Sequence, residues 1–349
     1  MPIRTPPTDA PSADVVRAEL LAPFVRDDVM AMEGAAFDRM LRHPEAFASM
    51  MDDDEDGDGC PYELDGGLAT LSVRGALAQR GGRFYCWSWP GYDTLAADLS
   101  RALVDERVRT VALVIDSPGG VVAGLFDAVR AMRAAVEASG KRVVAISDER
   151  CFSAAYALAC VADEIIVPET GGAGSVGVVG GMTSYAKALA AAGIDSRVYA
   201  SGAEKADGHP ALPISKEADA RAQQTVTEFG AIFRGFVAER RKMTPEAVQA
   251  LEAGVRYGAA AVSAGLADRM QPAASALAGL RASASNAPPA PPSPMMRLCP
   301  CASWPADGVA YHSPGVCRVA CVMALVLLFD SGGSQTACKT VKPASRKQR

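Results

Sequence analysis

Ser153 stands where a β-branched run gives way to small helix-forming residues, and a hydroxyl at such a junction can act as a nucleophile. The run from Val143 to Ile146 predicts a buried strand, and the sequence from Ala154 onward predicts a helix. A structural interpretation is available too, because serine is a preferred N-cap residue. Position alone favours the cap, so a chemical role needs support from other residues.

A glycine turn after another predicted strand could supply backbone donors. The apolar run 108–115 ends in Asp116-Ser-Pro-Gly-Gly120 and opens into a predicted helix over 122–138. Such a turn could hold a phosphate or offer N–H groups to a developing oxyanion. It lacks the Lys-Ser/Thr of a P-loop and the spacing of a dinucleotide fingerprint. The oxyanion interpretation is favoured, with a plain structural turn as the alternative.

A serine nucleophile needs a base, and histidine is scarce in this chain. His43 lies near the N-terminus and His312 in the tail, which leaves His209 in the main region. Lysine can take this role where burial disfavours its charged form. Lys205 is the candidate because it lies in a glycine-flanked loop after a strand predicted over 196–200. The alternative is an ordinary surface lysine.

The elements that must position these residues alternate along the chain. Strands are predicted over 68–73, 108–115, 143–146, 164–167 and 196–200, and helices over 92–103, 122–138, 182–192 and 216–242. Strand, glycine turn and helix in succession are typical of a parallel sheet covered by helices. We therefore expect an α/β fold.

Composition divides the chain into four parts. Residues 1–65 form an N-terminal helical arm that ends in an acidic linker, and residues 66–272 form the α/β domain. The acidic run 52–59 lacks the residue pattern of a calcium loop. Residues 273–294 are an Ala/Ser/Pro-rich linker, and residues 295–349 are a Cys-containing tail that we expect to be disordered.

Bulk properties narrow the function. The 349 residues carry a net charge of -5, so a nucleic-acid partner is not expected. We find no secretory signal and no apolar run of about 20 residues, and we expect a cytoplasmic protein without membrane association. Four tail cysteines with His312 could bind zinc, but their spacing matches no common site. No metal and no cofactor are expected.

Four segments in order resemble the signal peptide peptidase A family of Ser/Lys peptidases. They are Asp116-Ser-Pro-Gly-Gly120, Phe152-Ser-Ala-Ala-Tyr156, Gly174-Ser-Val-Gly-Val178 and Ser201-Gly-Ala-Glu-Lys205. The resemblance covers roughly residues 66–272. Within the family the chain is most similar to the phage head maturation (capsid assembly) proteases, through the tract 205–210 and the Gly/aromatic loop 81–89.

The resemblance implies a serine endopeptidase with Ser153 as nucleophile and Lys205 as base. It assigns the N–H groups of Gly119 and Ala154 to the oxyanion, and Ser175 to the orientation of Lys205. It also implies a ClpP/crotonase-like spiral of strand-strand-helix units that assembles into homo-oligomers. The dyad could form within one subunit or between two.

The implied substrates are scaffold, portal or capsid proteins, cleaved in the host cytoplasm or in the phage prohead. Autocleavage within residues 286–294 is a further hypothesis. Three other functions stay open at this point. They are a cellular peptidase that degrades signal peptides, a non-catalytic capsid-assembly or scaffold-binding protein that retains the fold, and a crotonase-type acyl-CoA enzyme.

Overall fold

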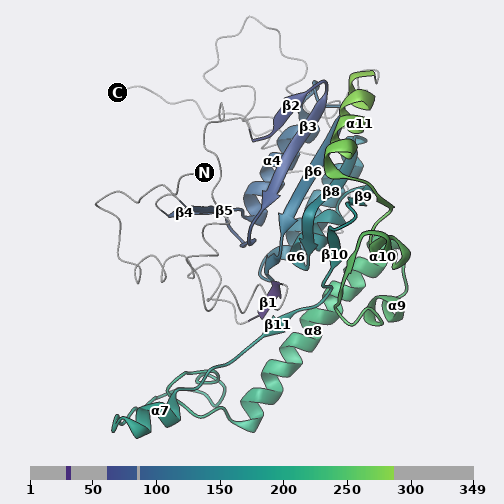
Figure 1. Ribbon diagram of the computed structural model, residues 1–349. Helices are drawn as coiled ribbons and strands as arrows, with labels where there is room; N and C mark the ends of the chain where they lie inside the picture. Colours follow the sequence, from purple (N-terminus) through teal and green to yellow (C-terminus); the bar gives the residue numbers. More distant parts are fainter. Residues whose placement is uncertain (1–28, 33–60, 85–86, 287–349) are drawn as a thin grey trace, which may run out of the picture. The chain divides into compact units, whose positions relative to one another are not determined.

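The fold is taken from a computed structural model, which describes residues 29–32, 61–84 and 87–286. Three predicted segments lie outside these residues: the acidic run 52–59, the tail 295–349, and the autocleavage segment 286–294 apart from residue 286. So does most of the predicted N-terminal arm. The elements that follow are labelled in Figure 1.

An eight-stranded sheet forms the centre of residues 61–286, in the order β12-β10-β8-β6-β3-β2, with β9 paired to β8 and β13 paired to β9 (Figure 1). The strands β3, β6 and β8 are parallel. Their bounds are Leu68–Arg74, Thr110–Ser117 and Arg142–Phe152. The edge strands β2 (Glu63–Asp65) and β12 (Val255–Tyr257) are antiparallel to their neighbours.

The strand β8 has different partners at its two ends. Its first half pairs with β9 (Glu164–Val167), and its last three residues pair with β10 (Gly172–Gly174). The short strand β13 (Arg269–Met270) extends the β9 side. Because both pairings are parallel, the carboxyl end of β8 emerges beside β10, and Ser153 is the next residue.

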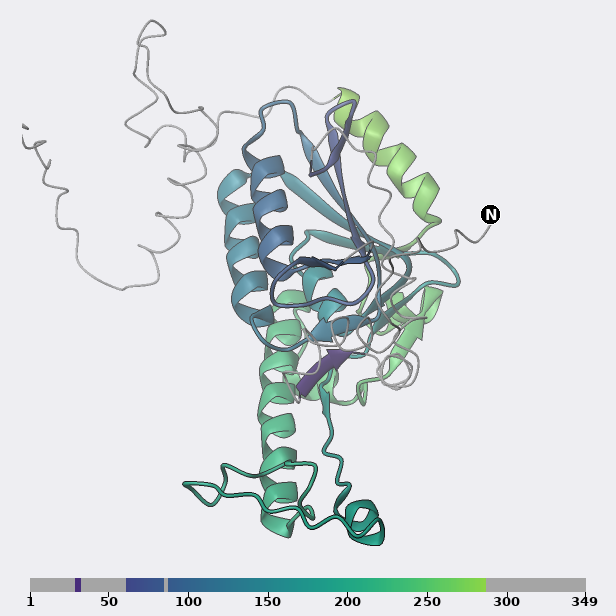
Figure 2. The same cartoon turned by 90° about the vertical axis from the view of Figure 1, so that its left-hand side faces the viewer.

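Alternate residues of the central strands face two separate cores, as the period of a strand requires. Val143 and Ala145 of β8 belong to a large core shared with helices α4 (Tyr92–Val104), α5 (Leu125–Ser139), α6 (Ala154–Ala159) and α8 (Lys216–Arg241). Val144 and Ile146 belong to a smaller core under α11 (Ala273–Asn286). Figure 2 shows α4 and α5 on one side of the sheet and α11 on the other.

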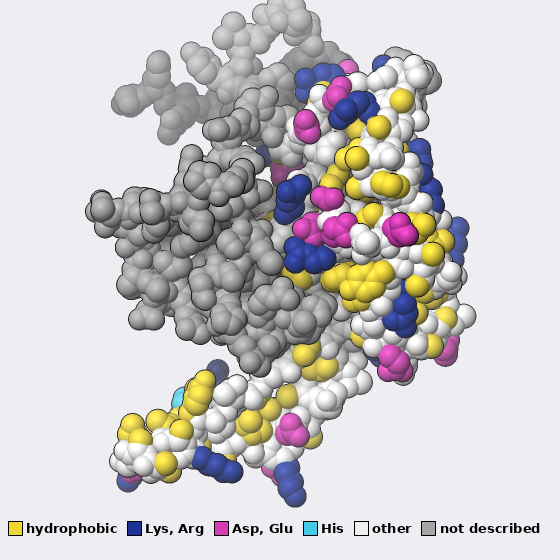
Figure 3. Space-filling model, in the orientation of Figure 1, with side chains coloured by type: hydrophobic (Ala, Val, Ile, Leu, Met, Phe, Trp, Pro, Cys, Tyr) yellow, Lys and Arg dark blue, Asp and Glu magenta, His cyan; other side chains and the backbone are white. Residues whose placement is uncertain are grey.

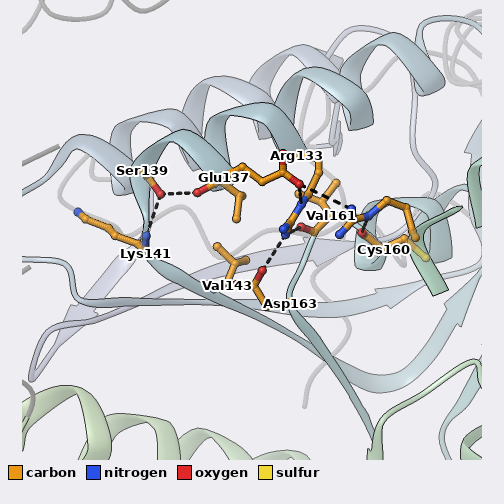
Figure 4. Close-up of polar contacts among 10 residues, drawn as sticks. Arg133, Glu137, Ser139, Lys141, Val143, Cys160, Val161 and Asp163 are labelled. Carbon is orange, nitrogen blue, oxygen red and sulfur yellow. Dashed lines mark hydrogen bonds and ion pairs between the residues drawn. The ribbon is translucent and has the colours of Figure 1, made fainter. Parts of the chain in front are cut away.

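A polar network fixes α5 to the elements that follow Ser153. Arg133 on α5 donates to the Val161 carbonyl at 3.0 Å and to an Asp163 carboxylate oxygen at 2.7 Å (Figure 4). The second Asp163 oxygen accepts the Val143 N–H at 3.0 Å. Arg133 also pairs with Glu137 at 2.7 Å. The start of β8 and the end of α6 are therefore tied to the same helix.

Short elements complete the described part of the chain. They are β1 (Val29–Met32), β4 (Gly82–Phe84), β5 (Trp87–Trp89), β7 (Gly119–Val121), β11 (Val179–Gly180), α7 (Ala186–Ala191), α9 (Pro245–Gln249) and α10 (Gly258–Ser263). In the described ranges no helix is long and apolar enough to cross a membrane.

The predicted α/β class is confirmed, with element boundaries that differ in places. The strand predicted over 143–146 continues to residue 152, because β10 offers a second partner to its polar half. Three predictions were wrong. Residues 29–32 of the predicted helical arm form a strand, and residues 196–200 form none, since no strand lies beside them to pair with. Residues 273–286 of the predicted linker form the helix α11.

The correction at α11 can be tested through Leu280, which is 4% exposed in the smaller core. Replacing Leu280 with alanine leaves a cavity, and we expect it to lower the free energy of unfolding by about 2–4 kcal/mol. Urea unfolding curves measure this change. Arg281→Ala on the same helix removes only an exposed ion pair with Asp65 and should cost no more than about 1 kcal/mol. Equal, small effects of both variants would restore the linker interpretation.

Candidate active site

Ser153 has an unusual backbone conformation. It joins the end of β8 to the first turn of α6, with φ 54° and ψ -118°. A residue with a Cβ rarely adopts a positive φ, and such a conformation costs about 1–3 kcal/mol. Strain of this size persists only where the surrounding structure imposes it, and it is concentrated at functional sites.

The cap interpretation of Ser153 does not fit the structure. Ser153 occupies the N-cap position of α6, but its side chain makes no capping hydrogen bond, and its backbone is not in the extended conformation of ordinary caps. The hydroxyl instead donates to the Gly177 carbonyl at 3.2 Å, and the Ser153 N–H donates to the Gly174 carbonyl at 2.8 Å. The turn after β10 therefore positions this fully buried serine.

Gly119 lies directly against Ser153. It has φ 106°, and a Cβ on it would stand 3.0 Å from the Ser153 Cβ and 2.2 Å from the Ala31 carbonyl oxygen. Neither the conformation nor the space allows a side chain. The Gly119 N–H donates to the Ser117 hydroxyl at 3.2 Å, so this donor is engaged within its own turn. The two residues that the sequence assigned to nucleophile and oxyanion are brought together.

Ala154 and Ser175 lie in the same region. Ala154 is fully buried and begins α6, where the first N–H groups have no partner within the helix. Ser175 is 9% exposed, has φ 55°, and lies in the turn that holds Ser153. Its N–H donates to the Gly254 carbonyl at 3.2 Å, and its carbonyl accepts from Gly177 at 2.9 Å.

Lys205 is not brought to Ser153 within one chain. It is exposed in the loop between α7 and α8, on an arm that projects from the sheet (Figure 1). Its neighbours Glu204 and Asp207 pair with Arg221 near the start of α8, at 3.9 and 2.7 Å. The loop is thus fixed to the outer end of that helix.

The length of α8 sets the separation. Gly230 packs near Val178 of the Ser153 turn, since a Cβ on it would stand 3.9 Å from the Val178 side chain. Nine residues of helix separate Arg221 from Gly230, a rise of about 13 Å. The loop that carries Lys205 therefore lies well away from Ser153.

Other nucleophiles and bases near these positions are less suited to the chemistry. Cys151 is two residues from Ser153, but burial raises the pKa of its thiol well above the usual value, which disfavours the reactive thiolate. Burial likewise raises the pKa of Cys160 to about 12. His209 is exposed on the arm, where its Nδ1 accepts the Ala211 N–H at 3.1 Å.

An ion pair joins the end of β8 to the strand end that precedes the Gly119 turn. Arg150 of β8 donates to both carboxylate oxygens of Asp116, at 2.7 and 3.1 Å. Asp116 immediately precedes Ser117 and the glycine turn. Sequence reasoning missed the roles of Arg150, Ser117 and Gly177, although Ser117 and Gly177 lie inside the motifs that were singled out. It also missed β1, whose Ala31 lies against Gly119.

No group of side chains that could hold a metal ion occurs among the residues the structure describes. The zinc alternative in the tail falls outside them.

Comparison with known proteins gives one family match. Residues 135–286 match the model of peptidase family S49, a segment that includes Ser153, Ser175, Lys205 and α11. Gly119 and β1 lie before it.

Curated relatives extend the similarity towards the N-terminus. Head-tail preconnector protein GP5 of Enterobacteria phage P21 is 36% identical over 217 residues, which are 62% of this chain and 43% of that protein. Capsid assembly protease C of Escherichia phage lambda is 30% identical over 245 residues, 69% of this chain and 55% of that protein. The chain thus spans about half the length of these two relatives.

A solved structure of a ClpP1 mutant from Listeria monocytogenes aligns with 51% of this chain and 84% of its own, at 14% identity and a TM-score of 0.32.

The family match includes the strained serine and both strands that position it. Over residues 135–286, this chain is therefore similar to peptidase family S49.

Proposed function

We propose that this protein is a serine endopeptidase that uses Ser153 as its nucleophile. The observation that carries the proposal is the conformation of Ser153, which is buried and strained, makes no capping bond, and lies against the glycine turn at 119. A cap would need none of these features. The match to a peptidase family over the same segment supports the assignment.

The reaction passes through an acyl-enzyme. The neutral Lys205 amine takes the Ser153 proton while Oγ adds to the substrate carbonyl carbon, and the N–H groups of Gly119 and Ala154 stabilise the oxyanion. For this, the Gly119 N–H must leave its bond to Ser117. The C–N bond then breaks and the leaving amine takes the proton from Lys205. A water molecule then gives a proton to Lys205 as its oxygen adds to the ester carbonyl carbon. The C–Oγ bond breaks, Lys205 returns the proton to Oγ, and the acid product leaves.

The base comes from a second copy of the chain. A lysine becomes a base where burial disfavours its charged form, and the arm leaves Lys205 exposed. The arm and the adjoining helix also expose large apolar side chains, which Figure 3 shows among polar ones on the projecting part. They are Tyr185, Ile194, Tyr199, Ile214 and Ile232. Docking of this arm on a neighbour would bury both them and Lys205, and Ser175 of the neighbour would then orient the amine.

The biological setting proposed is the maturation of a phage head. The two phage relatives are a head-tail preconnector protein and a capsid assembly protease. Scaffold, portal or capsid proteins are accordingly the substrates we propose, each presented as an extended segment.

Complementation between inactive variants tests the shared dyad. Ser153→Ala and Lys205→Ala should each abolish casein hydrolysis. Mixing the two chains under conditions that allow subunit exchange should restore up to about a quarter of wild-type activity, because a site needs its serine from one variant and its lysine from the other.

Lys187→Ala, which removes another exposed lysine of the same arm, is the matched control and should retain activity. Activity in Ser153→Ala alone would refute the nucleophile. If Lys205→Ala were inactive and mixing restored nothing, the dyad would belong to a single subunit.

The strain at Ser153 predicts an unusual order of stabilities. Glycine adopts the conformation of residue 153 without strain, so Ser153→Gly should be more stable than Ser153→Ala by about 1 kcal/mol. At Ala97, on the exposed face of α4, the same comparison should reverse, with Ala97→Gly about 1 kcal/mol less stable than the parent. Urea unfolding of the four proteins measures both differences. A Ser153→Gly variant less stable than Ser153→Ala would show that residue 153 is not strained.

A further inference from the structure

The strand β1 lies between two strands that belong to the Ser153 region. It pairs antiparallel with β7 on one side and with β11 on the other, forming a three-stranded sheet apart from the main sheet. Met30 is opposite Val121 and Val179, and Met32 is opposite Gly119. Figures 1 and 2 both show β1 at one end of the main sheet.

The main chain of β1 passes the nucleophile at close range. A Cβ on Gly119 would stand 3.0 Å from the Met32 Cα and 3.0 Å from the Ser153 Cβ. It would stand 2.2 Å from the Ala31 carbonyl oxygen. Met30, Ala31 and Met32 are 1%, 0% and 3% exposed. These residues are therefore enclosed in the site itself.

β1 is far in sequence from the strands of the main sheet. Residues 33–62 separate it in sequence from β2, the first strand of the main sheet. Without β1, β7 and β11 would present two facing strand edges with unpaired N–H and C=O groups. Exposed strand edges with unpaired N–H and C=O groups bind an extended peptide by adding it as a strand.

We infer that the space between β7 and β11, here called the strand slot, is a peptide-binding site, and that residues 29–32 are its internal occupant in the free chain. The inference rests on the proposed function in taking Ser153 as the reacting group. A substrate must displace residues 29–32 to reach Ser153. The slot occupied by residues 29–32 is thus the state of the enzyme without a bound substrate.

The occupant fixes the polarity of a bound peptide. β1 is antiparallel to both neighbours, and its C-terminal residue Met32 is the one beside Gly119 and Ser153. A substrate bound in the same way would place at Ser153 the bond that follows its residues in the slot. Residues on the N-terminal side of that bond would thus provide the recognition.

The slot also indicates which side chains fit. The position of Ala31 is completely enclosed, so the central residue of the ligand must be small. The flanking positions hold Met30 and Met32, unbranched side chains that adapt to irregular space. We expect an extended peptide with alanine-sized bulk at its centre and linear apolar residues on either side.

A groove continues from the slot on the side away from Ser153. Its volume is about 770 Å³, and it is lined by Val122 and Ala123 after β7, by Gly181 and Met182 after β11, and by residues of α5 and α8. Because β7 and β11 both run towards it, the groove would receive ligand residues that precede those in the slot. Its charged lining includes Asp127, Arg130, Asp219 and Arg221.

Hydrogen exchange of the full chain tests the occupant without relying on catalysis. In a Ser153→Ala background, Ala31→Pro removes the N–H of a strand residue and cannot form the same ladder. Amides of residues 120 and 179–180 should then exchange at least about tenfold faster. Ala10→Pro, outside the strand, is the control and should change nothing at these amides. Unchanged exchange in Ala31→Pro would overturn the inference.

A peptide added in trans tests the site and its preference. The ten-residue peptide Arg-Asp-Asp-Val-Met-Ala-Met-Glu-Gly-Ala, which reproduces residues 26–35, should restore slow exchange in Ser153→Ala/Ala31→Pro. The same peptide with leucine or tryptophan at the position of Ala31 should not. Protection by all three peptides would overturn the steric argument, and protection by none would overturn the slot as a binding site. Ala31→Arg is a second displacing variant if Ala31→Pro fails to fold.

Kinetics then separate this inference from the proposed function. An internal occupant acts as a competitor at a millimolar effective concentration, so its removal lowers KM and leaves kcat unchanged. With Ser153 intact, Ala31→Pro should lower the KM for a peptide substrate by about tenfold. If exchange responds as expected but no Ser153-dependent hydrolysis occurs, the proposed function fails and the slot stands. If hydrolysis occurs and neither exchange nor KM responds, the slot fails and the proposed function stands.

Discussion

The close approach of Gly119 to Ser153 is the constraint on which the site depends. Two parallel strands, β6 and β8, end side by side. The turns that follow them, at Gly119 and at Ser153, pack so closely that a side chain at residue 119 would not fit. The pairing of β6 with β8 shifts register between Ile115 and Ser117, just before the turn. The Asp116–Arg150 ion pair joins the two strand ends at the same level. Strand register, and not loop flexibility, therefore sets the distance between Ser153 and Gly119.

The strain at Ser153 is maintained by the packing around it. All six residues of α6 are buried, and β8 is held on both sides by parallel partners. A local conformation that costs about 1–3 kcal/mol is small beside the burial of such a helix and strand. The hydroxyl cannot relax into an ordinary cap, because the turn that includes Gly174 and Gly177 occupies its hydrogen bonds. The packing of β8 and α6 thus fixes the orientation of Ser153.

The elements that local sequence patterns determine could be predicted from the sequence. The elements whose secondary structure depends on tertiary contacts could not. Continuous apolar runs such as 108–115 identify buried strands, and the glycine turns identify the positions that need close approach. The sequence 29–32 carries no such signal, because Val-Met-Ala-Met suits a helix or a strand and only the edges of β7 and β11 select the strand. Residues 196–200 show the reverse case, a strand-forming composition without a partner. The helix α11 could not be predicted because an Ala/Ser-rich sequence is compatible with a linker or with a helix. The packing of Leu280 on the sheet selects the helix.

The location of Lys205 was beyond sequence analysis for a different reason. Motif order places Ser153 and Lys205 in one site, but the 26 residues of α8 carry the lysine loop outwards within a chain. In the proposed assembly, a docking arm brings the base to a neighbour's serine. The same arm begins directly after β11, which forms one wall of the strand slot. Docking of the arm and release of residues 29–32 therefore act on the same strand. In the two proposals, a chain that remains single lacks its base, and residues 29–32 fill its slot until a substrate displaces them, so both features oppose cleavage.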